Sequence, residues 1–148
     1  MTPKSSGVVV TFVTDQPNCI RLIEAGSRLA EGYGVPHWVI SIQPAASVSE
    51  YAAARLQVLY DMASRLGAEM TVLFHENPVL MAAVYLKKLH AIHAVSGIPG
   101  SGSTLFIESV RTCVPQLPWS VVDTDGKLLT FPPMQSAQSV HETAAAQA

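Results

Sequence analysis

The sequence predicts an α/β domain with a mostly parallel five-stranded sheet, helices on both faces and a short C-terminal hairpin extension. Short β-branched and apolar runs alternate with longer segments of helical periodicity, and the connections between them are short. Hydrophobic residues make up 49% of the chain and charged residues 14%. This composition is typical of strands buried on both faces, or of a further surface buried by oligomerisation. The 148 residues suffice for one such domain.

The predicted strands are apolar runs bounded by turn residues, over residues 7–14, 35–42, 68–74, 91–96 and 119–123. The first run, Val-Val-Val-Thr-Phe-Val, is rich in β-branched residues and suits a strand buried on both faces. Asp125-Gly126 is a strong hairpin turn, so residues 127–131 are expected to fold back as a short antiparallel strand.

Helical segments separate these strands, over residues 19–31, from Ser47 or Ser49 to 66, 77–89 and 104–114. Gly32 and Gly34 are expected to end the first helix, and Gly67 the second. Right-handed crossovers between parallel strands place helices on both faces of the sheet. Ligands of such sheets bind at the carboxyl ends of the strands, where the strand order reverses.

Composition also indicates the extent of the domain and argues against several classes of protein. The domain is expected over residues 1–132, followed by an Ala-, Gln- and Ser-rich tail, residues 133–148, that is expected to be disordered. The net charge is −2 and no basic stripe exists, so nucleic-acid binding has no support. The longest apolar run, residues 79–86, is shorter than the roughly 20 residues of a membrane helix. With no cleavage-site pattern, and with Cys19 and Cys113 read as reduced thiols, we expect a cytoplasmic protein.

A glycine-rich loop follows the fourth predicted strand and leads into the last helix. Its glycines and hydroxyl side chains are Gly97, Gly100, Ser101, Gly102, Ser103 and Thr104. Bare backbone N–H groups and hydroxyls in such a loop suit a phosphate. The spacing approaches that of a P-loop, but Ser103 stands where a lysine would follow Gly102, so phosphoryl transfer lacks its cation. A serine-rich helix cap without a ligand explains the pattern equally well, and both interpretations stay open.

Over residues 8–123 the chain resembles the universal stress protein family. The resemblance is strongest in residues 12–19 (Phe-Val-Thr-Asp-Gln-Pro-Asn-Cys), 28–30, 67–69 and 93–97. It looks most like the stress-protein domain of potassium-sensing histidine kinases and their stand-alone relatives. The resemblance implies a Rossmann-like fold of the adenine-nucleotide alpha hydrolase type and a regulatory or sensor function in stress response. It also implies a homodimer paired through the last strands.

The resemblance further implies where an adenine nucleotide such as ATP, with Mg²⁺, would bind. Family members that bind ATP carry Gly-x2-Gly-x9-Gly-Ser/Thr after the fourth strand and an Asp at the end of the first. Here Gly97 and Gly100 match the beginning of that motif, Glu108 replaces its later glycine, and Thr14 replaces the Asp. Glu108 would bring a carboxylate near the phosphates. The nucleotide is expected to meet Val13, Thr14 and Asp15 with its base or ribose, and Gly97, Gly100, Ser101, Gly102, Ser103 and Thr104 with its phosphates.

Two functions therefore remain: a nucleotide-binding regulatory module, or a dimeric protein-interaction module with a vestigial cleft. An enzyme, at most a slow ATPase, has less support because the sequence nominates no water-positioning group. His90 and His93 have no third ligand at useful spacing, so no metal site is predicted. Asp15 is interpreted as a helix N-cap or a ligand contact.

Overall fold

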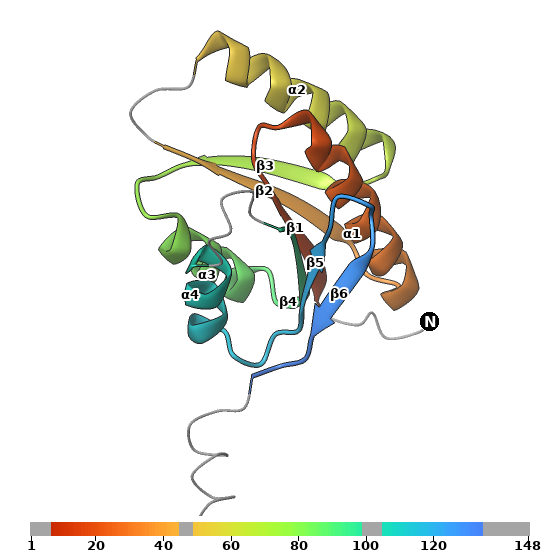
Figure 1. Cartoon of the computed structure of the whole chain (residues 1–148), viewed down its shortest axis with the longest axis vertical. Helices are drawn as coiled ribbons and strands as arrows, with labels where there is room; N and C mark the ends of the chain where they lie inside the picture. The colour runs from red at the N-terminus through yellow and green to blue at the C-terminus, as the bar shows by residue number, and fades with distance from the viewer. Residues whose placement is uncertain (1–6, 45–48, 99–104, 135–148) are drawn as a thin grey trace, which may run out of the picture.

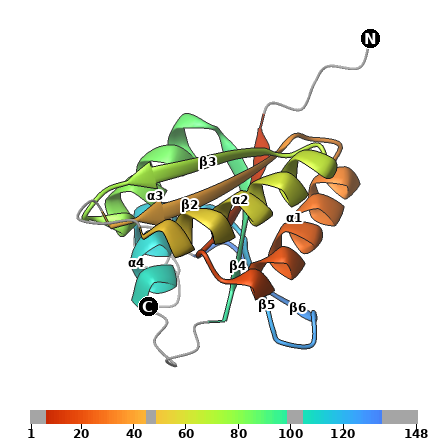
Figure 2. The same cartoon turned by 90° about the horizontal axis from the view of Figure 1, so that it is seen from above.

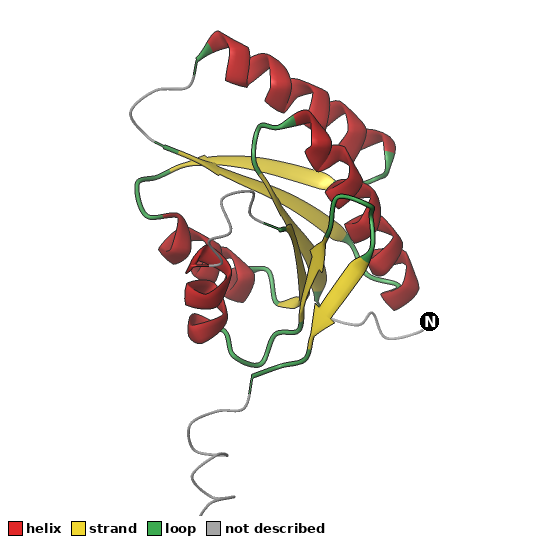
Figure 3. Ribbon diagram, in the orientation of Figure 1, coloured by secondary structure: helices red, strands yellow, loops and turns green. Residues whose placement is uncertain are grey.

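A six-stranded sheet in the order β3-β2-β1-β4-β5-β6 forms the centre of the molecule (Figures 1 and 3). The structure, a computed structural model, describes residues 7–44, 49–98 and 105–134. The strands are β1 (Val8–Val13), β2 (His37–Gln43), β3 (Glu69–Phe74), β4 (Ala91–Gly97), β5 (Trp119–Val122) and β6 (Leu128–Phe131). The first five strands are parallel to one another, and β6 is antiparallel to β5. The α/β class, the parallel sheet and the C-terminal hairpin are confirmed.

Two helices cover each face of the sheet. The helices are α1 (Ile20–Tyr33), α2 (Glu50–Arg65), α3 (Pro78–Lys88) and α4 (Leu105–Cys113), with a 3-10 turn η1 (Pro17–Cys19) before α1. Helices α1 and α2 lie side by side on one face, and α3 and α4 pack on the other (Figures 1 and 2). None of the helices in the described ranges is long and apolar enough to cross a membrane.

The core has two layers because β1 is buried along its whole length. Val9 and Val13 face α1 and α2, where they pack with Ile23 and other aliphatic side chains. Val10 and Phe12 face α3 and α4, where they pack in the second layer with the fully buried Trp119. The alternation of side chains along a strand produces this division. The expectation of strands buried on both faces is thus confirmed for β1.

Helix α1 extends past its predicted end. It runs to Tyr33 because Gly34, and not Gly32, takes the left-handed conformation (φ 72°) that closes the helix. The Gly34 N–H donates to the carbonyl oxygens of Ala30 and Glu31, which satisfies the last turn.

Strand β6 covers the edge of β5 that would otherwise be unpaired, so β6 itself is the edge strand. Strand β5 pairs with β4 on one side and with β6 on the other, so β6 is the outer strand here. Of the last strands, through which the resemblance implied a homodimer, β6 is the one with an unpaired edge, and pairing with a second copy through β5 would require β6 to leave. The predicted tail falls largely on residues 135–148, outside the described residues, and stays a prediction.

Candidate functional site

A cavity of about 360 Å³ opens at the carboxyl ends of β1 and β4. The strand order reverses between these two strands, which is where ligands bind in open α/β sheets. Its volume lies within the range of small-molecule sites. The described lining residues are Phe12, Val13, Thr14, Gln16, Asn18, Cys19, Arg21, Leu22, Ile40, Ile42, Pro78, Ser96, Gly97, Ile98, Phe106 and Ile107.

The inner wall of the cavity is apolar and held by aromatic contacts. The ring of Phe12 stacks on Trp119, with centroids 5.7 Å apart and planes 9° apart. Phe106 of α4 meets Phe12 edge-on at 5.9 Å. Trp119 Nε1 donates a hydrogen bond of 2.8 Å to Ser96 Oγ, which fixes a lining hydroxyl on β4. Such a wall suits a flat, weakly polar group.

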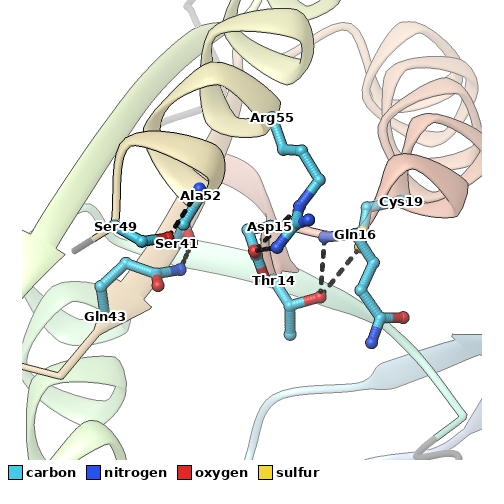
Figure 4. Close-up of polar contacts among 9 residues, drawn as sticks. All are labelled: Thr14, Asp15, Gln16, Cys19, Ser41, Gln43, Ser49, Ala52 and Arg55. Atoms are coloured by element: carbon cyan, nitrogen blue, oxygen red, sulfur yellow. Dashed lines mark hydrogen bonds and ion pairs between the residues drawn. The ribbon is translucent and has the colours of Figure 1, made fainter. Parts of the chain in front are cut away.

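The rim of the cavity is polar and comes from the segment between β1 and α1. Thr14 Oγ1 accepts a hydrogen bond from the Gln16 backbone N–H at 3.4 Å and lies 3.4 Å from Cys19 Sγ (Figure 4). Cys19 is a free, buried thiol. Of the three predicted base or ribose contacts, Val13 and Thr14 line the cavity.

The third predicted contact, Asp15, is not among the lining residues and pairs with Arg55 of α2. Its Oδ2 accepts hydrogen bonds from Arg55 Nη2 and, at 3.1 Å, from Arg55 Nε (Figure 4). These bonds raise the pKa of Arg55 above its usual value. The Arg55 guanidinium also lies 4.0 Å from the centre of the Tyr51 ring. Asp15 caps neither η1 nor α1, which have no side-chain cap, so the N-cap interpretation is wrong. Its contact with a ligand stays a prediction.

The predicted phosphate loop begins at the cavity. Gly97 ends β4 and lines the cavity, and a Cβ at this position would lie 3.3 Å from Leu22 Cδ1. The other predicted loop residues, Gly100, Ser101, Gly102, Ser103 and Thr104, lie outside the described residues. Glu108 is exposed on α4 and is not a lining residue, although Ile107 beside it is.

Sequence reasoning missed Arg21, a cation in the first turn of α1 that lines the cavity. The sequence contained a signal for Arg21. A basic residue is disfavoured in the first turn of a helix, at the positive end of the helix dipole, so its presence there points to a role other than helix stability. Ile40 and Ile42 were also missed, since their alternation along β2 is equally typical of core packing.

Two buried histidines lie away from the cavity, on either side of Val9 in the sheet register. His37 Nε2 is 2.7 Å from Thr11 Oγ1. His93 is hydrogen bonded through Nδ1 to the Tyr33 hydroxyl at 3.0 Å. Burial lowers the pKa of His37 to about 4 and also lowers the pKa of His93. In the part of the chain that the structure describes, three or more His, Cys, Asp or Glu side chains nowhere gather to hold a metal ion.

Comparisons with known proteins show which solved structures share this fold. Neither a protein-family model nor a curated protein sequence matches the chain. Among solved structures, a universal stress protein from Archaeoglobus fulgidus superposes with a TM-score of 0.61. The match has 18% identity and covers 79% of this chain and 92% of that one. The chain has the universal stress protein fold.

Two further structures with this fold were solved with nucleotides. A universal stress protein in complex with cAMP matches with a TM-score of 0.60 and 16% identity, over 80% of this chain and 98% of that chain. The universal stress protein from Archaeoglobus fulgidus in complex with dAMP matches with a TM-score of 0.56 and 18% identity, over 79% and 95%. The resemblance read from the sequence is thereby confirmed at the level of the fold.

Proposed function

We propose that this protein is a cytoplasmic regulatory module of the universal stress protein type that binds an adenine nucleotide. The observation that carries the proposal is the cavity at the strand-order reversal between β1 and β4. Two proteins of the same fold, in complex with cAMP and with dAMP, support an adenine nucleotide as the ligand.

The composition of the lining suits the two parts of such a ligand. The base would lie on the apolar wall, against Phe12, Ile40 and Ile42. Its ring nitrogens and the ribose hydroxyls would meet the polar rim at Thr14 and Asn18. The phosphates would then point toward Gly97, where the glycine-rich loop begins.

Calorimetry tests this proposal. We would titrate ATP with Mg²⁺, AMP and adenosine into the purified protein, and identify by mass spectrometry any nucleotide released on denaturation. Ile42→Trp fills the cavity and should abolish binding, whereas Val84→Trp changes an exposed residue of α3 and should not. No released nucleotide and no heat at millimolar ligand would reject the proposal.

A second candidate function, a dimeric protein-interaction module, has support from the outer strand. Leu128 and Leu129 are exposed on β6, the latter by 57%. An unpaired edge strand with apolar side chains is a template for pairing with another chain. We expect the homodimer to form through β6, and light scattering would measure its mass. Leu129→Lys should give a monomer, whereas Leu80→Lys, at an exposed position of α3, should not.

A further inference from the structure

Arg21 reaches from the first turn of α1 across the carboxyl edge of the sheet. Its Nε donates to the backbone oxygen of Asp123 at 2.9 Å, and its Nη1 donates to the backbone oxygen of Asn18 at 3.0 Å. Both acceptors are neutral carbonyls, so these bonds orient the guanidinium without neutralising it. Within the described ranges, the ion pair of this region is formed by Arg55 and Asp15.

Arg21 gives the described lining of the cavity a positive charge. Arg21 is the formally charged member of the described lining, and the other lining side chains are apolar or neutral. Asp15 and Asp123, the carboxylates of the two segments that follow β1 and β5, have other partners. Asp15 is paired with Arg55, and Asp123 Oδ1 accepts from the backbone N–H groups of Asp125 and Lys127. A cation in a cavity that is otherwise uncharged and partly shielded from water attracts an anion more strongly than it would in open water.

Arg21 also lies at the correct end of the cavity for a phosphate. Its acceptor Asp123 directly follows β5, whose last residue Val122 pairs with Gly97 at the end of β4. The guanidinium is therefore anchored beside the start of the glycine-rich loop. The loop sequence lacks the lysine of a P-loop, and Arg21 supplies a cation, from a different element, to the cavity that Gly97 lines.

The guanidinium keeps donors for such a ligand. An arginine side chain has five N–H donors in a planar fork, and the two described bonds use Nε and Nη1. A planar fork of this kind matches the oxygens of a phosphate. The start of α1, where a cation is otherwise disfavoured, adds partial positive charge of its own.

We propose that Arg21 binds a phosphate group of the nucleotide and makes the cavity selective for nucleotides over nucleosides. This inference rests on the proposed function, because the base of the same ligand occupies the apolar wall. Arg21 is thus the residue that determines specificity, and the apolar wall supplies affinity that nucleoside and nucleotide share.

Titration of AMP and adenosine into matched variants tests the inference. The native protein should bind AMP roughly tenfold or more tightly than adenosine, the range for hydrogen bonds to a charged group. Arg21→Gln should remove that difference and leave adenosine affinity within about twofold. Arg28→Gln removes the same charge from an exposed position of α1 and should change neither affinity.

The outcomes distinguish a failure of the proposed function from a failure of the role proposed for Arg21. If the native protein binds neither of these compounds nor ATP, the proposed function fails. If Arg21→Gln binds AMP as tightly as the native protein does, Arg21 is not the phosphate ligand and the proposed function stands. An equal loss for AMP and adenosine would show that Arg21 merely supports the cavity wall. Should Arg21→Gln not fold, the salt dependence of the native protein decides, because added KCl should weaken AMP binding and spare adenosine binding.

Discussion

Helix α1 lies close against the sheet at Gly26. A Cβ built at this position would lie 2.0 Å from Thr11 Oγ1 and 2.5 Å from His37 Nε2. Both neighbours are buried, and they hydrogen bond to each other, so neither can move aside freely. The absence of a side chain at Gly26 is what lets α1 lie against β1 and β2.

Gly26→Ala should therefore destabilise the protein by about 1–3 kcal/mol, the usual cost of overpacking a core. Urea unfolding followed by circular dichroism measures the change. Gly32→Ala is the matched control in the same helix, because its Cβ would meet nothing within 4 Å. We expect that control to be neutral or stabilising by roughly 0.5–1 kcal/mol. Equal effects of the two substitutions would contradict the packing argument.

Individual site residues were predictable where backbone position decides their place. Val13 and Gly97 end their strands, Thr14 directly follows β1, and strand ends at a strand-order reversal line the cavity. Asp15 was not predictable, because its side chain pairs with Arg55, 40 positions later in the chain. Such a pairing depends on how α2 lies across the sheet, and local sequence patterns carry no information about it.

At the scale of elements, the Asp15–Arg55 pair ties α2 to the segment between β1 and α1 (Figure 4). Arg55 also lies against Tyr51 one turn earlier, which restricts the guanidinium. The start of α2 is fixed by Ser49, whose Oγ accepts from the Ala52 N–H at 3.0 Å. These contacts hold the first half of α2 over the segment that forms the rim of the cavity.

A double-mutant cycle of Asp15→Asn and Arg55→Gln should give a coupling free energy of about 0.5–1 kcal/mol. The pair is partly exposed, so added salt should reduce this coupling. Denaturant unfolding of the four proteins at low and high salt measures it. Asp61→Asn, which removes an exposed carboxylate from the same helix, should show no coupling to Arg55→Gln. A coupling near zero at low salt would show that the pair does not hold α2.

The elements themselves were predictable because their boundaries have local chemical causes. Asn77 and Pro78 start α3, with Asn77 Oδ1 accepting from the Leu80 N–H at 3.1 Å. The end of α1 was misplaced because Gly32 and Gly34 look alike in the sequence. Their difference lies in backbone conformation, and Gly34 is the one that adopts positive φ.

At the scale of the whole molecule, the buried histidines make stability depend on pH. A hydrogen-bonded series runs from Tyr33 through His93 to Ser120 and then to Thr130, so it joins α1 to the last three strands. His37 Nδ1 is buried and has no partner in the described structure. Protonation of either ring would place a charge in the core.

Folding lowers the pKa of His37 from 6.5 to about 4, so the neutral ring is the form that the folded state prefers. Its contribution to stability is present above pH 6.5 and is lost as the pH falls toward 4. Between pH 7 and pH 5 the loss should be about 2 kcal/mol. Urea unfolding at the two pH values measures it. His37→Gln should flatten the dependence, and His75→Gln, at a partly exposed position after β3, should not. An unchanged slope in His37→Gln would contradict this assignment.

The architecture of the whole molecule was predictable from strand and helix alternation, because right-handed crossovers leave few arrangements. The outer position of β6 was less evident. Asp125-Gly126 predicts a hairpin, but whether that hairpin extends the sheet depends on partners far away in the chain. Here β5 pairs with β4, and His93 Nε2 of β4 lies 2.7 Å from Ser120 Oγ of β5, 27 positions away in the chain.

The position of Trp119 gives the cavity an optical signal. The indole is fully buried, stacks on Phe12 and donates to Ser96, and both of those residues line the cavity. A ligand that contacts Ser96 or shifts the Phe12 ring changes the surroundings of the indole without touching it. The protein contains one other tryptophan, Trp38, so Trp38→Phe leaves Trp119 as the sole indole emitter. Occupancy of the cavity should then be readable as a change in fluorescence intensity or wavelength, with no label attached.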